Sequence, residues 1–162
     1  MKSKTLLISS VLLVILLSFA ACNSNSNNPS GGLIKAKWVT AEKTDNDTLF
    51  VQTSDVKKNT IIHFKYNIAS RDSTFMAYEL DGNIFVRANV CPPCGSIGFS
   101  LQKDVLVCDT CATKFNARTG NGTSGACVNY PKSSVAYETD SGKIIMKVNE
   151  LIKAYQDTLR PG

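Results

Sequence analysis

Residues 91–131 read CPPCGSIGFSLQKDVLVCDTCATKFNARTGNGTSGACVNYP and contain five of the six cysteines in the chain. The first four form two Cys-x-x-Cys pairs, Cys91/Cys94 and Cys108/Cys111, with thirteen residues between the pairs. Two intervening residues allow a tight turn, or knuckle, that aims both thiolates at one ion. Two such knuckles complete a tetrahedral sulfur shell. One pair alone would be weak evidence, but two at this separation predict a metal site with four cysteine ligands.

Other interpretations of these cysteines stay open from spacing alone. Exported proteins meet an oxidising compartment, so disulfides are one alternative. A thioredoxin-like dithiol is another, but it expects a Cys-x-x-Cys that opens a helix, and Pro92-Pro93 with flanking strand patterns disfavours it. Cys127 is the odd cysteine. It is a candidate fifth ligand, a disulfide partner, or simply a small buried residue.

Outside the cysteine-rich segment, apolar residues recur mostly with period two, which is typical of half-buried strands. Asp81-Gly82 separates two such runs and predicts a hairpin. Residues 148–159 carry apolar side chains at helical spacing. Strand-like runs cover residues 34–41, 48–53, 60–68, 73–80, 83–88, 133–139 and 143–148.

These patterns predict a mainly β fold in residues 33–162: a small β-sandwich or barrel with an inserted two-knuckle metal-binding subdomain (91–131) and a short C-terminal helix. We expect Trp38 in the core, on one face with Ile34 and Ala36. His63 alternates with Ile62 and Phe64, so we expect it on the solvated face of its strand. No catalytic constellation is visible, and no enzymatic activity is predicted.

The N-terminus predicts export and membrane anchoring. Residues 1–21 have a basic start, an apolar stretch and a small-residue end before Cys22, which is the layout of a lipoprotein signal peptide with lipidation at Cys22. The alternatives are an ordinary signal peptide or an uncleaved anchor. Residues 22–32 are polar and predict a flexible tether. We therefore expect an extracytoplasmic, membrane-anchored lipoprotein, on the cell surface or the periplasmic side.

The charge of the chain is uninformative about partners. Removal of Lys2 and Lys4 with the leader lowers the net charge from +5 to +3. The longest basic block is the pair Lys57-Lys58, so no nucleic-acid partner is predicted.

The segment 91–131 resembles the domain of the membrane iron–sulfur FtrD-like family, and residues 75–91 (FMAYELDGNIFVRANVC) resemble its lead-in strand pair. The resemblance covers about residues 60–150. Its specific parts are the two knuckles and the GxCxxxP ending that holds Cys127 and Pro131. The segment is more distantly similar to Rieske domains, with cysteines in place of the histidine ligands.

The resemblance implies an iron–sulfur cluster or mononuclear iron, serving electron transfer or an iron-transport or redox complex in the membrane. Thiolate chemistry alone allows a structural zinc almost equally, in a module that docks a membrane partner. Cu(I) also suits soft thiolates, with less support. A metal chaperone that exchanges its cargo through Cys127 is a further alternative.

Overall fold

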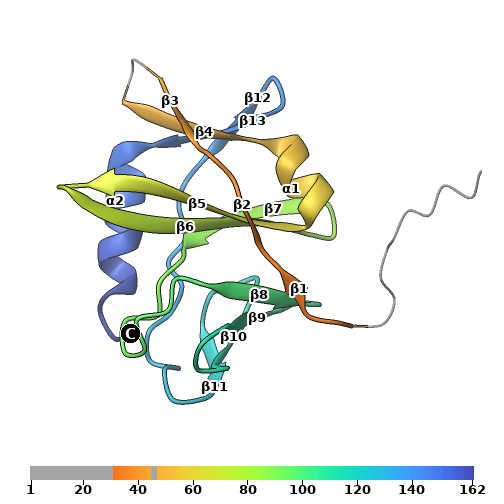
Figure 1. The fold of residues 1–162 in the computed structure, drawn as a ribbon, viewed down its shortest axis with the longest axis vertical. Coiled ribbons are helices and arrows are strands. Elements are labelled where there is room, and N and C mark those ends of the chain that lie inside the picture. Colours follow the sequence, from red (N-terminus) through yellow and green to blue (C-terminus); the bar gives the residue numbers. More distant parts are fainter. Residues whose placement is uncertain (1–30, 45–46) are drawn as a thin grey trace, which may run out of the picture.

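Three β-sheets and two helices build the part of the chain that the computed structural model describes, residues 31–44 and 47–162 (Figure 1). The predicted signal peptide, Cys22 and most of the predicted tether lie outside these residues. The mainly β fold with a C-terminal helix is confirmed. No helix within the described residues is long and apolar enough to cross a membrane.

Two of the three sheets, together with both helices, form the body of the molecule. The central sheet has the order β2 (Lys37–Trp38), β5 (Ile61–Ile68), β6 (Arg71–Leu80), β7 (Asn83–Ala88). The second sheet has the order β12 (Glu138–Asp140), β13 (Lys143–Lys147), β4 (Thr48–Gln52), β3 (Glu42–Lys43). The helices are α1 (Thr53–Asn59), which the sequence pattern did not predict, and α2 (Val148–Thr158).

The third sheet belongs to the predicted knuckle subdomain. Its order is β1 (Ile34–Lys35), β8 (Phe99–Gln102), β9 (Val105–Cys108), β10 (Lys114–Asn116), β11 (Gly122–Ser124). Figure 1 shows this sheet below the central one, on the side away from β4 and β13. The cysteine-rich segment therefore forms this sheet together with β1, with the first knuckle in the loop before β8 and the second in the turn between β9 and β10.

The central sheet is buried on both faces, and this arrangement positions the knuckle subdomain. Along β6, Phe75 and Ala77 belong to the core shared with the second sheet, whereas Met76 and Tyr78 belong to the core shared with the knuckle sheet. All four side chains are fully buried. A strand with both faces buried no longer shows polar alternation, because neither face meets water.

Two side-chain predictions were wrong, and the first of them for this reason. His63 is only 2% exposed, because the face predicted to be solvated is covered by the knuckle sheet. Trp38 is 42% exposed instead of lying in the core. The predicted strand 34–41 is split, since Ile34 pairs with β8 in the knuckle sheet whereas Lys37 and Trp38 pair with β5 in the central sheet.

The hairpin prediction at Asp81-Gly82 is confirmed. Strands β6 and β7 pair antiparallel up to Leu80 and Asn83. Both turn residues have positive φ, 49° at Asp81 and 77° at Gly82. That geometry matches the twist of the flanking strands. This hairpin leads directly into Cys91.

Burial of His63 predicts a loss of stability in acid. Desolvation by burial lowers the pKa of His63 to about 4, against the opposing effects of Asp109 and a hydrogen bond to the Phe99 backbone. In the unfolded chain the histidine has a pKa of about 6.5, so as the pH falls it is protonated before His63 of the folded protein. The contribution of His63 to the free energy of unfolding is therefore complete above pH 6.5. It falls by about 3 kcal/mol as the pH decreases towards 4.

Urea unfolding of the metal-free protein across this pH range checks the prediction. His63→Gln should flatten the dependence between pH 6.5 and 4, because glutamine has no titrating group there. An equally steep loss of stability in the variant would show that the carboxylates, and not His63, cause it.

Candidate metal centre

The first knuckle follows β7 and is closed by its own backbone. Cys91 N–H donates to Ser96 O at 2.8 Å, and Gly95 N–H donates back to Cys91 O at 2.9 Å. Gly95, directly after Cys94, has a φ of 69°, which glycine adopts without steric cost. The loop thus fixes the backbone of both cysteines, independently of any bound group.

The second knuckle joins β9 to β10 and closes with the equivalent bonds. Cys108 N–H donates to Thr113 O at 2.9 Å, and Ala112 N–H donates to Cys108 O at 3.0 Å. Ala112 takes the same left-handed conformation that glycine has in the first loop, with a φ of 56°. The two knuckles are therefore matched turns, and neither opens a helix as a thioredoxin-like dithiol would.

Cys127 reaches the knuckles through a close contact with the second one. Its backbone N–H donates to Thr113 Oγ1 at 3.2 Å, and the same hydroxyl is hydrogen-bonded to Cys111 Sγ at 3.2 Å. The approach depends on Gly125, where a Cβ would lie 2.7 Å from Thr113 Cα and where φ is 109°. Gly125 and Thr113 together fix the backbone of Cys127 beside Cys111.

The five cysteines that the structure describes bring their sulfurs together at this point, and all five are free thiols. The sulfurs of Cys91, Cys94, Cys111 and Cys127 lie within 4.8 Å of one another. Cys108 Sγ lies 3.7 Å from Cys94 Sγ, and Cys127 Sγ lies 3.7 Å from Cys111 Sγ. The structure thus places every predicted ligand at one site. The Cys-x-x-Cys spacing predicted Cys108 as the fourth ligand. The four sulfurs that all lie within 4.8 Å of one another include Cys127 instead, and we call them the compact set.

The surroundings give the sulfurs different acidities. Burial raises the pKa of the Cys91 thiol, and it raises that of Cys108 against hydrogen bonds that lower it. Burial also opposes ionisation of Cys111. There, however, hydrogen bonds from the Thr113 hydroxyl and backbone and from two neighbouring cysteines lower the pKa to about 6. These contacts therefore favour the thiolate form of Cys111, which is the form that ligates a metal.

The sulfurs also differ in exposure. Cys91, Cys108 and Cys127 are buried among Phe99 and Phe115, whereas Cys94 and Cys111 are half-buried. A group held here has one edge near solvent and the remainder inside an apolar core. The apolar side would shield the thiolates from water, and the half-buried side would stay accessible to solvent.

Comparison with known protein families matches residues 37–157 to the family described as membrane iron–sulfur containing protein, FtrD-like. The chain belongs to this family. The match spans the central sheet, both knuckles and most of α2. It confirms the resemblance seen in the cysteine segment. No curated protein matches the chain.

Two solved structures resemble this member of the FtrD-like family. One is a chain from a complex of reduced oxygenase and oxidised ferredoxin in carbazole 1,9a-dioxygenase, with 19% identity and a TM-score of 0.49, covering 61% of this chain and 93% of that one. The other is a ferredoxin of Sphingomonas yanoikuyae B1, with 16% identity and a TM-score of 0.43, covering 51% and 83%. Similarity at this level carries no information on function.

The donors present fit the centre that the FtrD-like family name implies. All are cysteine sulfurs, which as thiolates suit zinc, Cu(I) and iron–sulfur centres. A tetrahedral ion with metal–sulfur bonds of about 2.3 Å holds its sulfurs about 3.8 Å apart. Each candidate set of four contains one edge of this length: Cys111–Cys127 at 3.7 Å in the compact set, and Cys94–Cys108 at 3.7 Å in the Cys-x-x-Cys set. The site is therefore preformed for a metal or iron–sulfur centre.

Two side chains beside the sulfurs give no signal in the sequence pattern. One is the bridging Thr113. The other is Lys132, which is fully buried. Burial lowers the pKa of Lys132 to about 8, against the attraction of Cys91, Cys108, Cys127 and Cys94. A lysine in a polar loop normally predicts solvent exposure, so only the tertiary contacts reveal its position.

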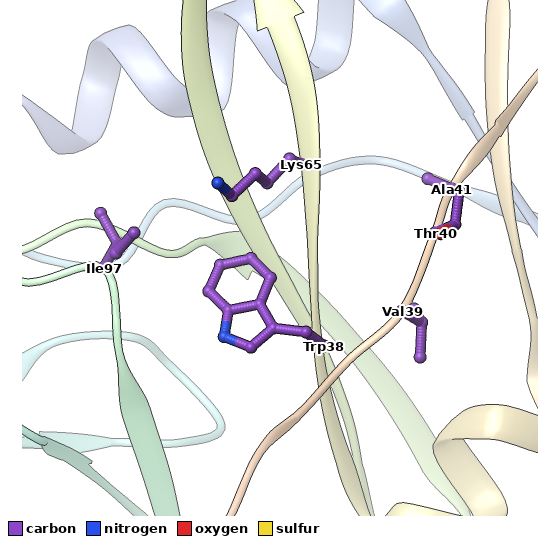
Figure 2. A pocket seen from close by; sticks show the side chains of 6 residues that line it. All are labelled: Trp38, Val39, Thr40, Ala41, Lys65 and Ile97. Carbon is purple, nitrogen blue, oxygen red and sulfur yellow. The ribbon is translucent and has the colours of Figure 1, made fainter.

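A groove of about 620 Å³ lies beside the first knuckle. It is lined by Trp38, Val39, Thr40, Ala41, Lys65 and Ile97 (Figure 2). Trp38 and Ile97 are both more than two-fifths exposed, and Lys65 Nζ lies 5.6 Å from the centre of the Trp38 ring. The lining contains no acid, histidine or cysteine. The groove is thus a mainly apolar surface with one cation, Lys65, and its lining offers no metal ligand of these types.

Proposed function

We propose that the chain is a lipid-anchored, extracytoplasmic electron-transfer protein whose cysteines hold an iron–sulfur or mononuclear iron centre. The convergence of five free cysteine sulfurs on two matched knuckles, in a member of a membrane iron–sulfur family, carries this proposal. Such a centre supplies one-electron redox chemistry when bound.

The residues of the chain would hold the centre in place and shield it from water. The backbone bonds within each knuckle fix the ligand positions before binding, so little rearrangement accompanies loading or reduction. Phe99 and Phe115 exclude water from the buried side, and their rings pack edge to face at 5.8 Å. Cys94 and Cys111 form the more exposed edge, where electrons would enter and leave.

Reductive titration of the full chain, purified anaerobically from membranes in detergent, tests the redox role. We expect a visible absorption band that bleaches on reduction with dithionite, together with a paramagnetic signal in one of the two oxidation states. A metal-loaded protein whose spectrum does not respond to reductant would contradict electron transfer.

The anchor is part of the proposal and rests on residues 1–32 of the sequence. We infer that processing leaves Cys22 as a lipidated N-terminus and residues 23–32 as a tether. The partner would then be an iron-transport or redox complex in the same membrane. Mass spectrometry of the mature chain tests the anchor. A mature N-terminus elsewhere, or a Cys22 without lipid mass, would contradict it.

A structural zinc is the second candidate, and the compact sulfur set favours it. Four sulfurs within 4.8 Å of one another suit a single ion, whereas a cluster places additional metal and sulfide between its ligands. Zinc predicts a colourless protein with one metal ion per chain that unfolds on chelation. Metal content and colour together therefore distinguish the two candidates.

A further inference from the structure

Lys132 places a positive charge inside the knuckle core. Its side chain is fully buried, and Nζ donates to Val90 O at 2.7 Å. Nζ also lies 4.7 Å from the ring centre of Phe115 and 5.4 Å from that of Phe99. Val90 directly precedes Cys91, and both rings belong to the same core as the buried sulfurs. The ammonium group is therefore held next to the cysteine site.

The backbone of Lys132 is fixed as firmly as its side chain. Its N–H donates to Gly120 O at 2.8 Å, and its carbonyl accepts a bond from Arg87 Nη1 at 2.8 Å. A Cβ at Gly120 would lie 2.2 Å from the Lys132 carbonyl oxygen, so only glycine allows this approach. The position of the charge is thus determined by the fold and does not depend on a flexible side chain.

No carboxylate compensates this charge within the described residues. The ion pairs found there all lie at the surface, and none includes Lys132. Arg87, also buried, donates only to neutral oxygens and adds a second cation nearby. A buried cation without an anion is strongly unfavourable, so the fold requires an anionic group close by. The cysteine sulfurs are the anion-forming groups in this core.

We propose that Lys132 is the buried counter-cation of the cysteine centre. Four thiolates around a metal carry net negative charge, and a fixed ammonium group in a low-dielectric core favours that charge. Where the centre is redox-active, as in the proposed function, one electron from the reductant adds one negative charge. Lys132 then stabilises the reduced form more than the oxidised form and raises the reduction potential.

Midpoint potentials of the full chain with Lys132→Met and Lys132→Gln test this assignment. Glutamine keeps an amide donor for Val90 O, whereas methionine removes both the donor and the charge. We expect both variants to be at least tenfold harder to reduce, a fall of 59 mV or more for a one-electron couple. Lys114→Met is the matched control, because Lys114 is exposed on β10. Its charge is screened by water, so its potential should stay close to that of the wild type.

An unchanged potential in both Lys132 variants, or the same fall in Lys114→Met, would overturn the proposal. The stability of the metal-free protein distinguishes an electrostatic role of Lys132 from a purely structural one. Without the anionic centre the lysine has no anionic partner, so metal-free Lys132→Gln should unfold at a urea concentration no lower than that of the metal-free wild type. A variant that fails to fold without metal would show that the lysine is structural, and this too would overturn the assignment.

Metal affinity separates this proposal from the proposed function. If the chain holds only zinc, electron transfer is wrong, but the counter-cation still predicts weaker binding of an anionic thiolate site. Competition for Co²⁺ should then show at least tenfold lower affinity in both Lys132 variants and wild-type affinity in Lys114→Met. Equal affinity in all four proteins would refute the role of Lys132 while leaving the redox titration to decide the proposed function.

Discussion

Cys111→Ala should abolish metal binding, and the same is expected of Cys91→Ala and Cys94→Ala. These three sulfurs belong to the mutual set within 4.8 Å and also to the Cys-x-x-Cys pairs. Each of them belongs to both candidate sets of four ligands, so its removal leaves either set with only three thiolates, and we expect the purified variant to hold no metal. Metal content per chain and the absorption spectrum measure the loss.

Cys108→Ala and Cys127→Ala are expected to behave differently from these three. Either variant retains one complete candidate set of four, because Cys108 Sγ and Cys127 Sγ each lie 3.7 Å from a sulfur of the other three. We expect each single variant to keep a metal with altered spectrum or stability. The double variant retains only three sulfurs and should lose it.

The single alanine variants distinguish two possible sets of four ligands. Both contain Cys91, Cys94 and Cys111, and the fourth ligand is either Cys108 or Cys127. Complete loss in Cys108→Ala alone would identify the four Cys-x-x-Cys sulfurs as the ligands, with Cys127 dispensable. Complete loss in Cys127→Ala alone would identify the compact set. Full metal retention in Cys111→Ala would contradict a cysteine-ligated centre at this site altogether.

Arg87→Met should be the most destabilising single change outside the cysteines. The buried guanidinium donates to Tyr78 Oη at 2.8 Å, to Lys132 O at 2.8 Å and to Arg118 O at 2.5 Å. Tyr78 in turn donates to Ala117 O at 2.5 Å. These bonds connect β6 and β7 of the central sheet to the loop that returns Cys127. Methionine fills similar space but leaves buried carbonyls unpaired, which costs about 3 kcal/mol.

Urea unfolding of the metal-free, reduced protein checks this value, and Arg118→Met is the matched control. The Arg118 side chain pairs with Asp81 at the surface, where the side chains are 45% and 77% exposed. Loss of a screened surface pair costs only about 0.5 kcal/mol. If Arg87→Met were no more destabilising than Arg118→Met, the buried network would not hold the knuckle subdomain to the body.

The sequence predicted those parts of the fold that depend on residues close together in the chain. The hairpin at Asp81-Gly82, the strands on either side of it and the C-terminal helix follow from turn chemistry and periodicity over a few residues. The two knuckles follow from Cys-x-x-Cys spacing for the same reason. Each of these features is determined by residues adjacent in the chain.

The features that the sequence did not reveal depend on contacts between distant segments. His63 is buried because a second layer covers its face of β5, and strand alternation cannot report that layer. Cys127 joins the site through Thr113, fourteen residues away. Arg87 and Lys132 are charged, and composition predicts such residues at the surface unless a buried partner is known. Only the assembled core shows that they lie beside the sulfurs.

Elemental analysis combined with an absorption spectrum of the full chain, purified anaerobically, tests the central claim most directly. A cysteine-held iron or iron–sulfur centre predicts stoichiometric iron with visible sulfur-to-metal charge-transfer bands, both absent from Cys111→Ala. A chain with no more iron or zinc than Cys111→Ala would contradict the existence of the centre. Disulfides among Cys91, Cys94, Cys108, Cys111 and Cys127 in that metal-free chain would identify what takes its place.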